Sequence, residues 1–511
     1  MKTGSLRSTS ENLKSFFTRE NSAVIVLLFI GFLLRIRQYL TGRSLWVDEA
    51  MLALNIVNRD FAGLFKPLDY DQGTPLGFLL VEKFFNILLG KSEFVLRLFP
   101  LMMGLAALWL FYLLLKRTTS GTGLLFALAL FALNPRLVYY SSEVKQYIVD
   151  VAVTIGLLLV TECLFDEHPS KKYFIWFTLA GLLALWFSHP ALFVLAGIGL
   201  TLVLVYLRRQ DYISLRLALE MGSIWIINLV FLYFLILKDL RQNTFMQEYW
   251  QDAFVPMPPW HDMGWYLSSI NKNIGLQFGI PYATLFVFGF MLLGWYMLWL
   301  HKREYALAFA CILFITLTAS ALRLYPVAER MILFLVPVGL ILVGKSMEAI
   351  QQRLSARPIL GTGIVLMLSV YLLYGPFTTS LGYFLQPKYY EHIRPAMAYL
   401  QEKVKAGDVL YVSYGAVPAF RFYAPGYELD KMRYEAGERD DYQNPQLILQ
   451  RLDKFKGQRR VWVLMSHVYE QDGFNERDFI LAHLDQIGTK IREIRKPDTS
   501  VYLFFYNLGN E

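Results

Sequence analysis

Long apolar runs recur along most of this chain, and they limit its possible folds more than any other feature. A helix needs roughly 17 to 25 predominantly apolar residues to cross the hydrocarbon core of a bilayer. About eleven runs meet this length, near residues 22–40, 96–115, 121–138, 146–165, 173–188, 190–207, 217–238, 280–300, 305–322, 331–349 and 358–377. Hydrophobic residues make up 55% of the 511 residues, which is above the range of soluble globular proteins. The sequence therefore predicts a mainly α, polytopic membrane protein.

Basic residues between the runs indicate their orientation. Cytoplasmic ends of membrane helices carry an excess of Lys and Arg. A cytoplasmic N-terminal tail, residues 1–21, places all the main basic clusters on its own side: Lys2, Arg7, Lys14, Arg19, Lys116, Arg117, Lys171, Lys172, Arg208, Arg209, Lys302, Arg303, Arg353 and Arg357. The first run is followed by Arg35 and Arg37 instead of a small-residue cleavage site, so we interpret it as a retained anchor. With an odd number of spans in residues 22–378, the segment 379–511 is then extracytoplasmic.

One shorter apolar stretch, residues 75–90, is interpreted as a helix lying in the outer interface. Counting it as a span would move every later basic loop to the opposite face. Pro75 suits a first helical turn and Gly90 a helix end. The first outer loop is therefore expected to contain interfacial helices.

The composition changes to charged and aromatic residues from about Gln386 onward. Apolar runs of strand length occur at 408–414, 460–465 and 501–506, and helical patterns at 390–404, 445–452 and 476–484. Strands that alternate with helices predict a small α/β domain over residues 379–511.

Two adjacent carboxylates, Asp48 and Glu49, follow the first apolar run. Ionisable groups near a membrane are costly to desolvate, so they often line a polar cavity or take part in chemistry. The structural alternative is an N-terminal cap for a helix beginning near Ala50. We assign both residues to a catalytic site, with Asp48 as the candidate base and Glu49 turned about 100° away to orient a neighbour or cap the helix.

Further polar and aromatic residues fall on the same predicted outer face. The candidates for substrate binding are Asp71, Tyr139, Tyr140, Glu143, Lys145, Tyr147, Asp150, Arg323 and Arg330. A carboxylate can accept a proton from a hydroxyl, cations can bind and neutralise a phosphate, and tyrosines can stack on a sugar ring. Together these groups fit sugar transfer from a lipid phosphate to a hydroxyl. Structural alternatives remain: a solvated loop around Lys145, a buried ion pair for Asp150, and lipid-interface anchoring for Arg323 or Arg330.

These motifs resemble those of the GT-C glycosyltransferases over roughly residues 20–350. The resemblance rests on Trp46 to Ala50, Gly73 to Leu76, the set Ser142, Glu143, Lys145, Gln146, Tyr147 and Asp150, and Glu329 to Met331. More narrowly, the chain is similar to protein O-mannosyltransferases and lipid A aminoarabinose transferases. The resemblance implies a bacterial inner-membrane enzyme with a periplasmic active site. It also implies a sugar donor of the undecaprenyl- or dolichyl-phosphate type, inversion at the anomeric carbon, and Asp48 as the base.

The chain departs from that family in places that concern a metal. Relatives often carry His-Pro-Pro or Glu-Lys-Pro where this chain has Gly73, Thr74 and Pro75, and the aminoarabinose branch has an Arg where this chain has Met51. Gly73 has no side chain to bind a metal. Asp71 and His261 are the available substitutes, but no pair has helical ligand spacing. A divalent metal is therefore left open and no metal site is predicted.

The expected partners are the polyprenyl-phosphate sugar donor, an envelope acceptor that is a lipid, glycan or protein, and membrane lipids. The formal charge of +8 is spread over loops without a basic stripe, so nucleic acid is not expected. Two other function classes use similar features: a lipid or sugar transporter or flippase, and a polysaccharide polymerase or ligase. A transporter should show internal repeats and charges near the midplane, whereas these charges gather toward one face.

Overall fold

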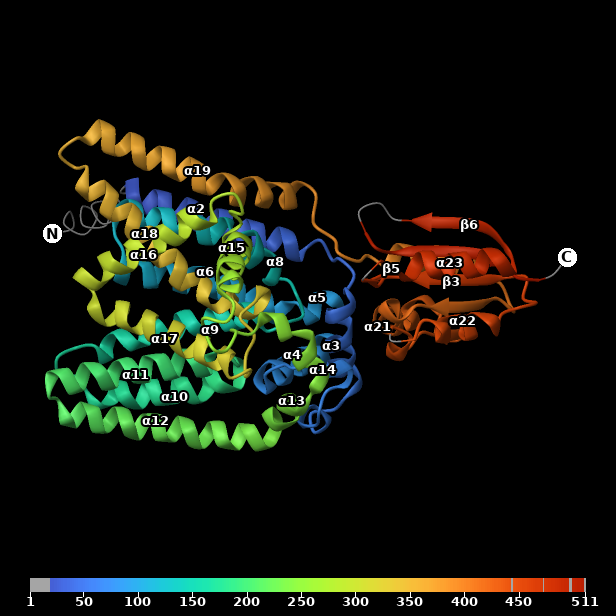
Figure 1. Ribbon diagram of the computed structural model, residues 1–511, viewed down its shortest axis with the longest axis horizontal. Helices are drawn as coiled ribbons and strands as arrows, with labels where there is room; N and C mark the ends of the chain where they lie inside the picture. Colours follow the sequence, from blue (N-terminus) through green and yellow to red (C-terminus); the bar gives the residue numbers. More distant parts are fainter. Residues whose placement is uncertain (1–18, 443, 472, 496–498, 510–511) are drawn as a thin grey trace, which may run out of the picture.

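The computed structural model has a helical domain with a small α/β domain at one end (Figure 1). It describes residues 19–442, 444–471, 473–495 and 499–509, so Lys2, Arg7 and Lys14 of the predicted cytoplasmic tail lie outside the described residues. The start of the first described helix and the α/β domain lie toward opposite ends of the long axis. This arrangement agrees with an odd number of membrane crossings.

Nine helical segments among the described residues are long and apolar enough to cross a membrane. They contain α2 (Arg19–Tyr39), α6 (Leu98–Thr118), α9 (Tyr147–Thr161), α11 (Ala191–Arg209), α12 (Tyr212–Leu232), α16 (Thr284–His301), α17 (Arg303–Ala321), α18 (Val336–Arg353) and α19 (Pro358–Leu385). The remaining two predicted spans contain shorter helices, the apolar α7 (Gly121–Leu133) and α10 (Lys171–Phe187). Each predicted run therefore contains a helix, and the chain is a multi-pass membrane protein.

Two boundaries differ from the sequence prediction. The predicted helix over 121–138 is interrupted at Asn134, whose Oδ1 accepts hydrogen bonds from the amides of Arg136 and Leu137, both at 3.0 Å. Asn134 thereby caps a separate helix, α8 (Pro135–Tyr140). Helix α19 continues to Leu385, past the predicted domain boundary at 378.

Short helices gather at the end of the bundle that faces the α/β domain. They include α3 (Val47–Asn58), α4 (Leu76–Leu89) and α5 (Glu93–Leu96) of the first loop, and α13 (Lys238–Gln242) and α14 (Thr244–Tyr249) of a later one. Helix α15 (Met263–Phe278) of that later loop lies nearer the middle of the bundle in this view (Figure 1). The 3₁₀ segment η6 (Glu329–Leu335) leads into α18. Helix α4 matches the helix predicted for 75–90, and it ends at Gly90, whose φ of 88° is readily adopted by glycine.

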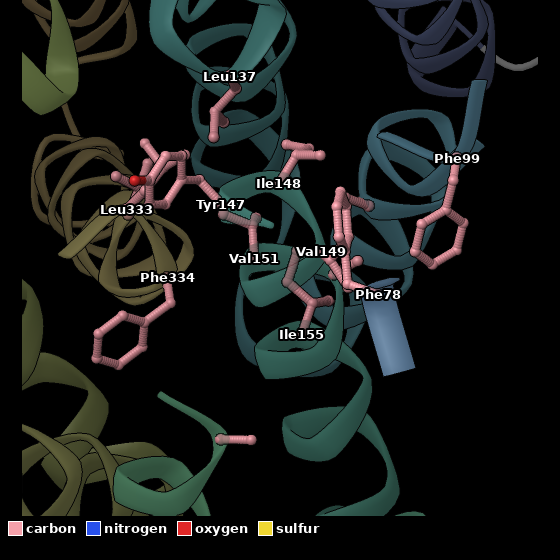
Figure 2. Close-up of a cluster of buried hydrophobic side chains, with 14 of the residues drawn as sticks. Phe78, Phe99, Leu137, Tyr147, Ile148, Val149, Val151, Ile155, Leu333 and Phe334 are labelled. Atoms are coloured by element: carbon pink, nitrogen blue, oxygen red, sulfur yellow. The ribbon is translucent and has the colours of Figure 1, made fainter. Parts of the chain in front are cut away.

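Helix α9 lies at the centre of the core. Ile148, Val149 and Ile155 are fully buried. Figure 2 shows the α9 side chains between Leu333 and Phe334 on one side and Phe78 and Phe99 on the other. Because α9 is packed on several sides, the residues at its N-terminal end are held firmly relative to η6.

The α/β domain contains a five-stranded sheet of order β2-β1-β3-β7-β6. Its strands are β1 (Val409–Val412), β2 (Arg433–Ala436), β3 (Val461–Met465), β6 (Thr489–Arg495) and β7 (Tyr502–Asn507). A separate two-stranded sheet is formed by β4 (Glu470–Gln471) and β5 (Phe474–Asn475). Strand β1 is parallel to β2 and β3, and β7 is antiparallel to β3 and β6. The helices of this domain are α20 (Arg394–Lys403), α21 (Val417–Tyr423), α22 (Gln446–Asp453) and α23 (Glu476–Ile487).

The two faces of the larger sheet belong to different cores. Leu410 and Trp462 join the core of the helical domain, whereas Val409 and Val461 pack in a second core that contains residues of α22 and α23. Neighbouring strand residues point to opposite faces, which explains this division. Helix α21 packs directly on α3. The α/β domain is therefore joined to the first outer loop by a continuous apolar core.

Candidate active site

The two carboxylates occupy the first turn of α3, which begins at Val47. Trp46, the residue before the helix, provides no side-chain cap, and its indole Nε1 donates to Glu143 Oε1 at 3.3 Å instead. Consecutive residues of a helix point about 100° apart. Asp48 and Glu49 consequently have different surroundings.

Asp48 lies between two cations. Its Oδ1 accepts from Lys145 Nζ at 2.8 Å and from Gln72 Nε2 at 3.3 Å, and Arg330 Nη2 lies 3.1 Å from Oδ2. Lys145 also donates to Gln72 Oε1 at 2.5 Å. Burial raises the pKa of Asp48, but Lys145 and Arg330 outweigh that effect and hold the pKa at about 2. Asp48 is therefore an ionised carboxylate at neutral pH.

Glu49 is fully buried and bound on both oxygens. Arg97 donates to Oε1 through Nε at 2.9 Å and to Oε2 through Nη2 at 2.6 Å. The Val144 amide donates to Oε1 at 2.9 Å, and Arg43 Nη2 lies 3.9 Å away. Burial opposes ionisation, but the arginines outweigh it and lower the pKa of Glu49. Through these contacts Glu49 connects the first loop to Arg97, which directly precedes α6, and to Val144, which follows Glu143.

Aromatic rings surround the Arg330 guanidinium. Its central carbon lies 5.6 Å from the Trp46 ring centroid and 5.7 Å from that of Tyr147. Tyr140 packs edge-on against Tyr147 with centroids 5.3 Å apart, and Tyr139 packs against Tyr140 at 5.6 Å. Cation–π contacts of this kind are attractive and favour this position of the guanidinium.

Several buried polar atoms beside these rings have no hydrogen-bond partner within the described part of the chain. They are Glu143 Oε2, the Tyr139 hydroxyl, Gln146 Oε1, Arg136 Nη1 and Arg330 Nε. Burial and the nearby charge of Glu49 raise the pKa of Glu143 to about 7. Buried polar groups in folded proteins normally have partners. Such a concentration of unsatisfied groups is typical of a binding site for a polar ligand.

An apolar cavity of about 530 Å³ adjoins this polar cluster. Gly73, next to Gln72, and Met331, next to Arg330, line it, so one part of its wall is adjacent to the residues that contact Asp48. Most of the remaining lining is aliphatic or aromatic, from α10, α11, α12 and the α13–α14 segment. A long apolar group can occupy this space while a charged head group lies near Arg330.

The structure brings most of the predicted site residues together. Tyr139, Tyr140, Glu143, Lys145, Tyr147 and Arg330 all lie around Asp48 or its direct neighbours. Asp150 lies one turn into α9 and is buried. The sequence reasoning did not select Gln72, Arg43 or Arg97. Gln72 stands directly between Asp71, a predicted binding residue, and the Gly73 to Leu76 motif, and this position in the sequence is the signal available for it.

Two predicted residues have other surroundings. Asp71 forms an ion pair with Arg439 of the α/β domain and accepts a hydrogen bond from Asn243 Nδ2 at 2.5 Å. Its carboxylate therefore links the first loop to the α/β domain and to the segment between α13 and α14. Arg323 lines the apolar cavity and is exposed there. Within the described residues no cluster of three His, Cys, Asp or Glu side chains has the geometry of a metal site. His261 is exposed in its loop.

Comparison with known proteins connects this geometry to a fold. No protein-family model and no curated protein matches the chain. ArnT from Cupriavidus metallidurans bound to undecaprenyl phosphate has a TM-score of 0.56 and 16% identity, with 96% of this chain and 98% of that chain covered. The chain has the GT-C fold.

Two further structures agree with the GT-C assignment. ArnT from the same organism in the apo state gives a TM-score of 0.53 at 15% identity, again covering 96% of this chain and 98% of the other. The apo oligosaccharyltransferase of Archaeoglobus fulgidus gives 0.52 at 12% identity, covering 89% of this chain and 70% of that protein. The expected fold class, a GT-C-like helical domain followed by a small α/β domain, is confirmed.

Proposed function

We propose that the protein is an integral-membrane glycosyltransferase. It transfers a sugar from a polyprenyl phosphate of the undecaprenyl type to a hydroxyl of an extracytoplasmic lipid, glycan or protein. The observation that carries the proposal is an ionised Asp48 held between Lys145 and Arg330 beside an apolar cavity of about 530 Å³. A base, phosphate-binding cations and space for a lipid are the parts that this reaction needs.

The donor fits the site in two parts. Its isoprenoid chain occupies the apolar cavity, and its phosphate lies beside Met331 at the wall, within reach of Arg330 and Lys145. Charge-assisted hydrogen bonds to these cations hold the phosphate and stabilise it as a leaving group. The undecaprenyl phosphate bound to ArnT, which has a similar fold, supports this class of lipid.

The reaction proceeds by displacement at the anomeric carbon. The acceptor oxygen forms a bond to this carbon while the bond from the carbon to the phosphate oxygen breaks, which inverts the configuration. An Asp48 oxygen takes the acceptor proton, and polyprenyl phosphate leaves with the electron pair. The unsatisfied atoms near Tyr139 and Glu143 are available to the sugar hydroxyls.

Glu49 is assigned a different role from Asp48. Both of its oxygens bind Arg97, and it is fully buried. Glu49 therefore acts as a positioning residue for the first loop, in place of the catalytic role assigned from the sequence. The positive-inside pattern supports placing the site and the α/β domain on the extracytoplasmic face, which is the periplasmic face in the bacterial inner membrane proposed for this protein.

Transfer of a labelled sugar by the detergent-purified chain, measured with a panel of polyprenyl-phosphate sugars, tests the function. We expect transfer to an added hydroxyl acceptor with at least one donor. Arg330→Ala should weaken binding of undecaprenyl phosphate about 10- to 100-fold, the range for losing a hydrogen bond between charged groups. Arg303→Ala, an exposed arginine at the start of α17, is the matched control and should bind normally. Equal affinity in the two variants would remove Arg330 from the phosphate site.

The raised pKa of Glu143 predicts a pH dependence of donor binding. Its pKa of about 7 means that it is neutral below this pH and gains a negative charge above it. The added charge repels the donor phosphate, so affinity for undecaprenyl phosphate should fall as the pH rises from 6 to 8. Glu143→Gln stays neutral and should lose this part of the dependence. Titration of the lipid phosphate itself affects both proteins equally, so identical pH profiles would contradict the prediction.

A further inference from the structure

Side chains of the α/β domain bind the backbone of the loop that presents Asp48. The Ser44 amide donates to His392 Nδ1 at 3.2 Å, and the Leu45 amide donates to the Tyr423 hydroxyl at 2.9 Å. The Val47 amide, in the first residue of α3, donates to Glu391 Oε2 at 2.8 Å. Three amides within four residues are thus held by a domain that lies more than 340 positions later in the chain.

Glu391 is the best placed of these groups. The first amides of a helix lack partners within the helix, and a carboxylate there also interacts favourably with the helix dipole. Because Trp46 supplies no side-chain cap, Glu391 takes that role from outside the segment. Its side chain is only 4% exposed.

His467 fixes the second oxygen of Glu391. Its Nδ1 lies 2.7 Å from Oε1, and the residue follows β3, at the end of the sheet that faces Trp46. The backbone of His467 has a φ of 51°, in the left-handed region that most residues avoid. A conformation of this kind persists where the surrounding structure enforces it.

The opposite side of the same loop is held by the helical domain. Arg97 Nη1 donates to the Arg43 carbonyl at 2.7 Å, and its Nη2 donates to the Ser44 carbonyl at 3.4 Å. The loop is therefore fixed through its carbonyls by α6 and through its amides by the α/β domain. Removal of either set of hydrogen bonds would leave only the other set to hold the start of α3.

We propose that the α/β domain positions the catalytic base, with Glu391 as the positioning residue and His467 as its support. The contact sets where α3 begins and hence where the Asp48 carboxylate lies relative to Lys145 and Arg330. The catalytic part of this inference rests on the proposed function. The structural part, that Glu391 protects the start of α3, does not.

Hydrogen exchange of the full-length detergent-purified chain tests the structural part. Glu391→Ala should speed exchange of amides in a peptide covering residues 44–50 by about 5- to 30-fold, the factor that corresponds to loss of a helix cap. Glu391→Gln keeps an acceptor for Val47 and a partner for His467, so it should restore most of the protection. Arg421→Ala removes a different contact between the domains, to the Tyr70 hydroxyl, and should leave this peptide unchanged.

Kinetics test the catalytic part with the same variants. Glu391→Ala should lower kcat about 10- to 100-fold, as expected for a displaced catalytic group. Binding of undecaprenyl phosphate should be unchanged, and Glu391→Gln should recover kcat. Unchanged exchange in Glu391→Ala, or an equal rise in Arg421→Ala, would overturn the proposal. If exchange rises as expected but the wild type transfers no sugar, the proposed function fails while the structural role of Glu391 stands.

Discussion

Asp48→Asn is expected to lower kcat for sugar transfer by about 10²- to 10⁴-fold, the usual contribution of a general base. The amide cannot accept the hydroxyl proton, although it fits the same space. Donor binding should be equal or tighter. Lys145 and Arg330 now share a carboxylate, and the neutral amide leaves both cations free for the phosphate. The measurements are steady-state kinetics of transfer and binding of undecaprenyl phosphate to the purified variant.

The opposite behaviour of kcat and affinity distinguishes loss of the base from loss of the fold. A misfolded protein would lose both, whereas this variant should keep its melting temperature and its affinity. Asp430→Asn, an exposed carboxylate of the α/β domain, is the matched control and should transfer sugar normally. Near-normal kcat in a folded, donor-binding Asp48→Asn variant would show that another group takes the proton.

The acidic side of the pH profile of kcat provides a second check on the assignment of Asp48 as the base. Asp48 has a pKa of about 2, below the usual value for aspartate, so it loses its charge only as the pH falls toward 2. No loss of the base is therefore expected between pH 5 and 8. Glu143, with a pKa of about 7, is expected to contribute to changes near neutral pH, and only this contribution should disappear in Glu143→Gln.

The helical architecture could be predicted because apolar length is a strong local signal. Each predicted run contains a helix, and the helix predicted for 75–90 is present as α4. The predicted run at 121–138 extends past the break at Asn134 because apolar residues continue on both sides. Pro135 disfavours helical backbone at Asn134, and the Asn134 side chain caps the helix that follows. Such a cap is not visible in hydropathy.

In the α/β domain, the buried strands β1, β3 and β7 were predicted but the edge strands β2 and β6 were not. The edge strand β6 has the sequence Thr-Lys-Ile-Arg-Glu-Ile-Arg and is largely exposed, so its charged residues resemble a loop. Charged residues are common on edge strands because they prevent pairing with other chains. Pairing with β7, which is a long-range contact, stabilises β6 as a strand.

The residues of the site could be predicted from their types, but which of them lie close together could not. Sequence reasoning selected Asp48, Lys145 and Arg330, with Arg330 preferred over Arg323 for the phosphate, yet it kept Asp71 and Arg323 in the same set because spacing does not reveal distance. The roles of Arg97 and Glu391 depend on contacts to loops far along the chain. One carboxylate of the adjacent pair contacts the groups proposed to bind substrate, and the other is enclosed by arginines, which only the packing shows.

The Glu49–Arg97 pair is expected to have the largest effect on stability. Both side chains are at most 2% exposed, and Arg97 Nη2 lies 2.6 Å from Glu49 Oε2. Glu49→Ala leaves the Arg97 charge buried without its carboxylate partner, and Arg97→Ala does the same to Glu49. Breaking a buried pair on one side costs about 3–5 kcal/mol. Thermal unfolding in detergent should show a large fall in melting temperature for each single variant.

The double variant Glu49→Ala/Arg97→Ala distinguishes the free-energy cost of an unpaired buried charge from the cost of lost packing. With both charges gone, the cost of an uncompensated buried ion disappears, so the double variant should be less destabilised than the sum of the single variants. Recovery should be incomplete, because Arg97 also supports the Arg43 and Ser44 carbonyls and Glu49 accepts from the Val144 amide. The exposed pair Arg216–Glu220 is the control, since its loss should cost only about 0–1 kcal/mol. Strict additivity at Glu49 and Arg97 would mean that the ion pair does not couple the first loop to α6, and the fixed position of Asp48 would then require another cause.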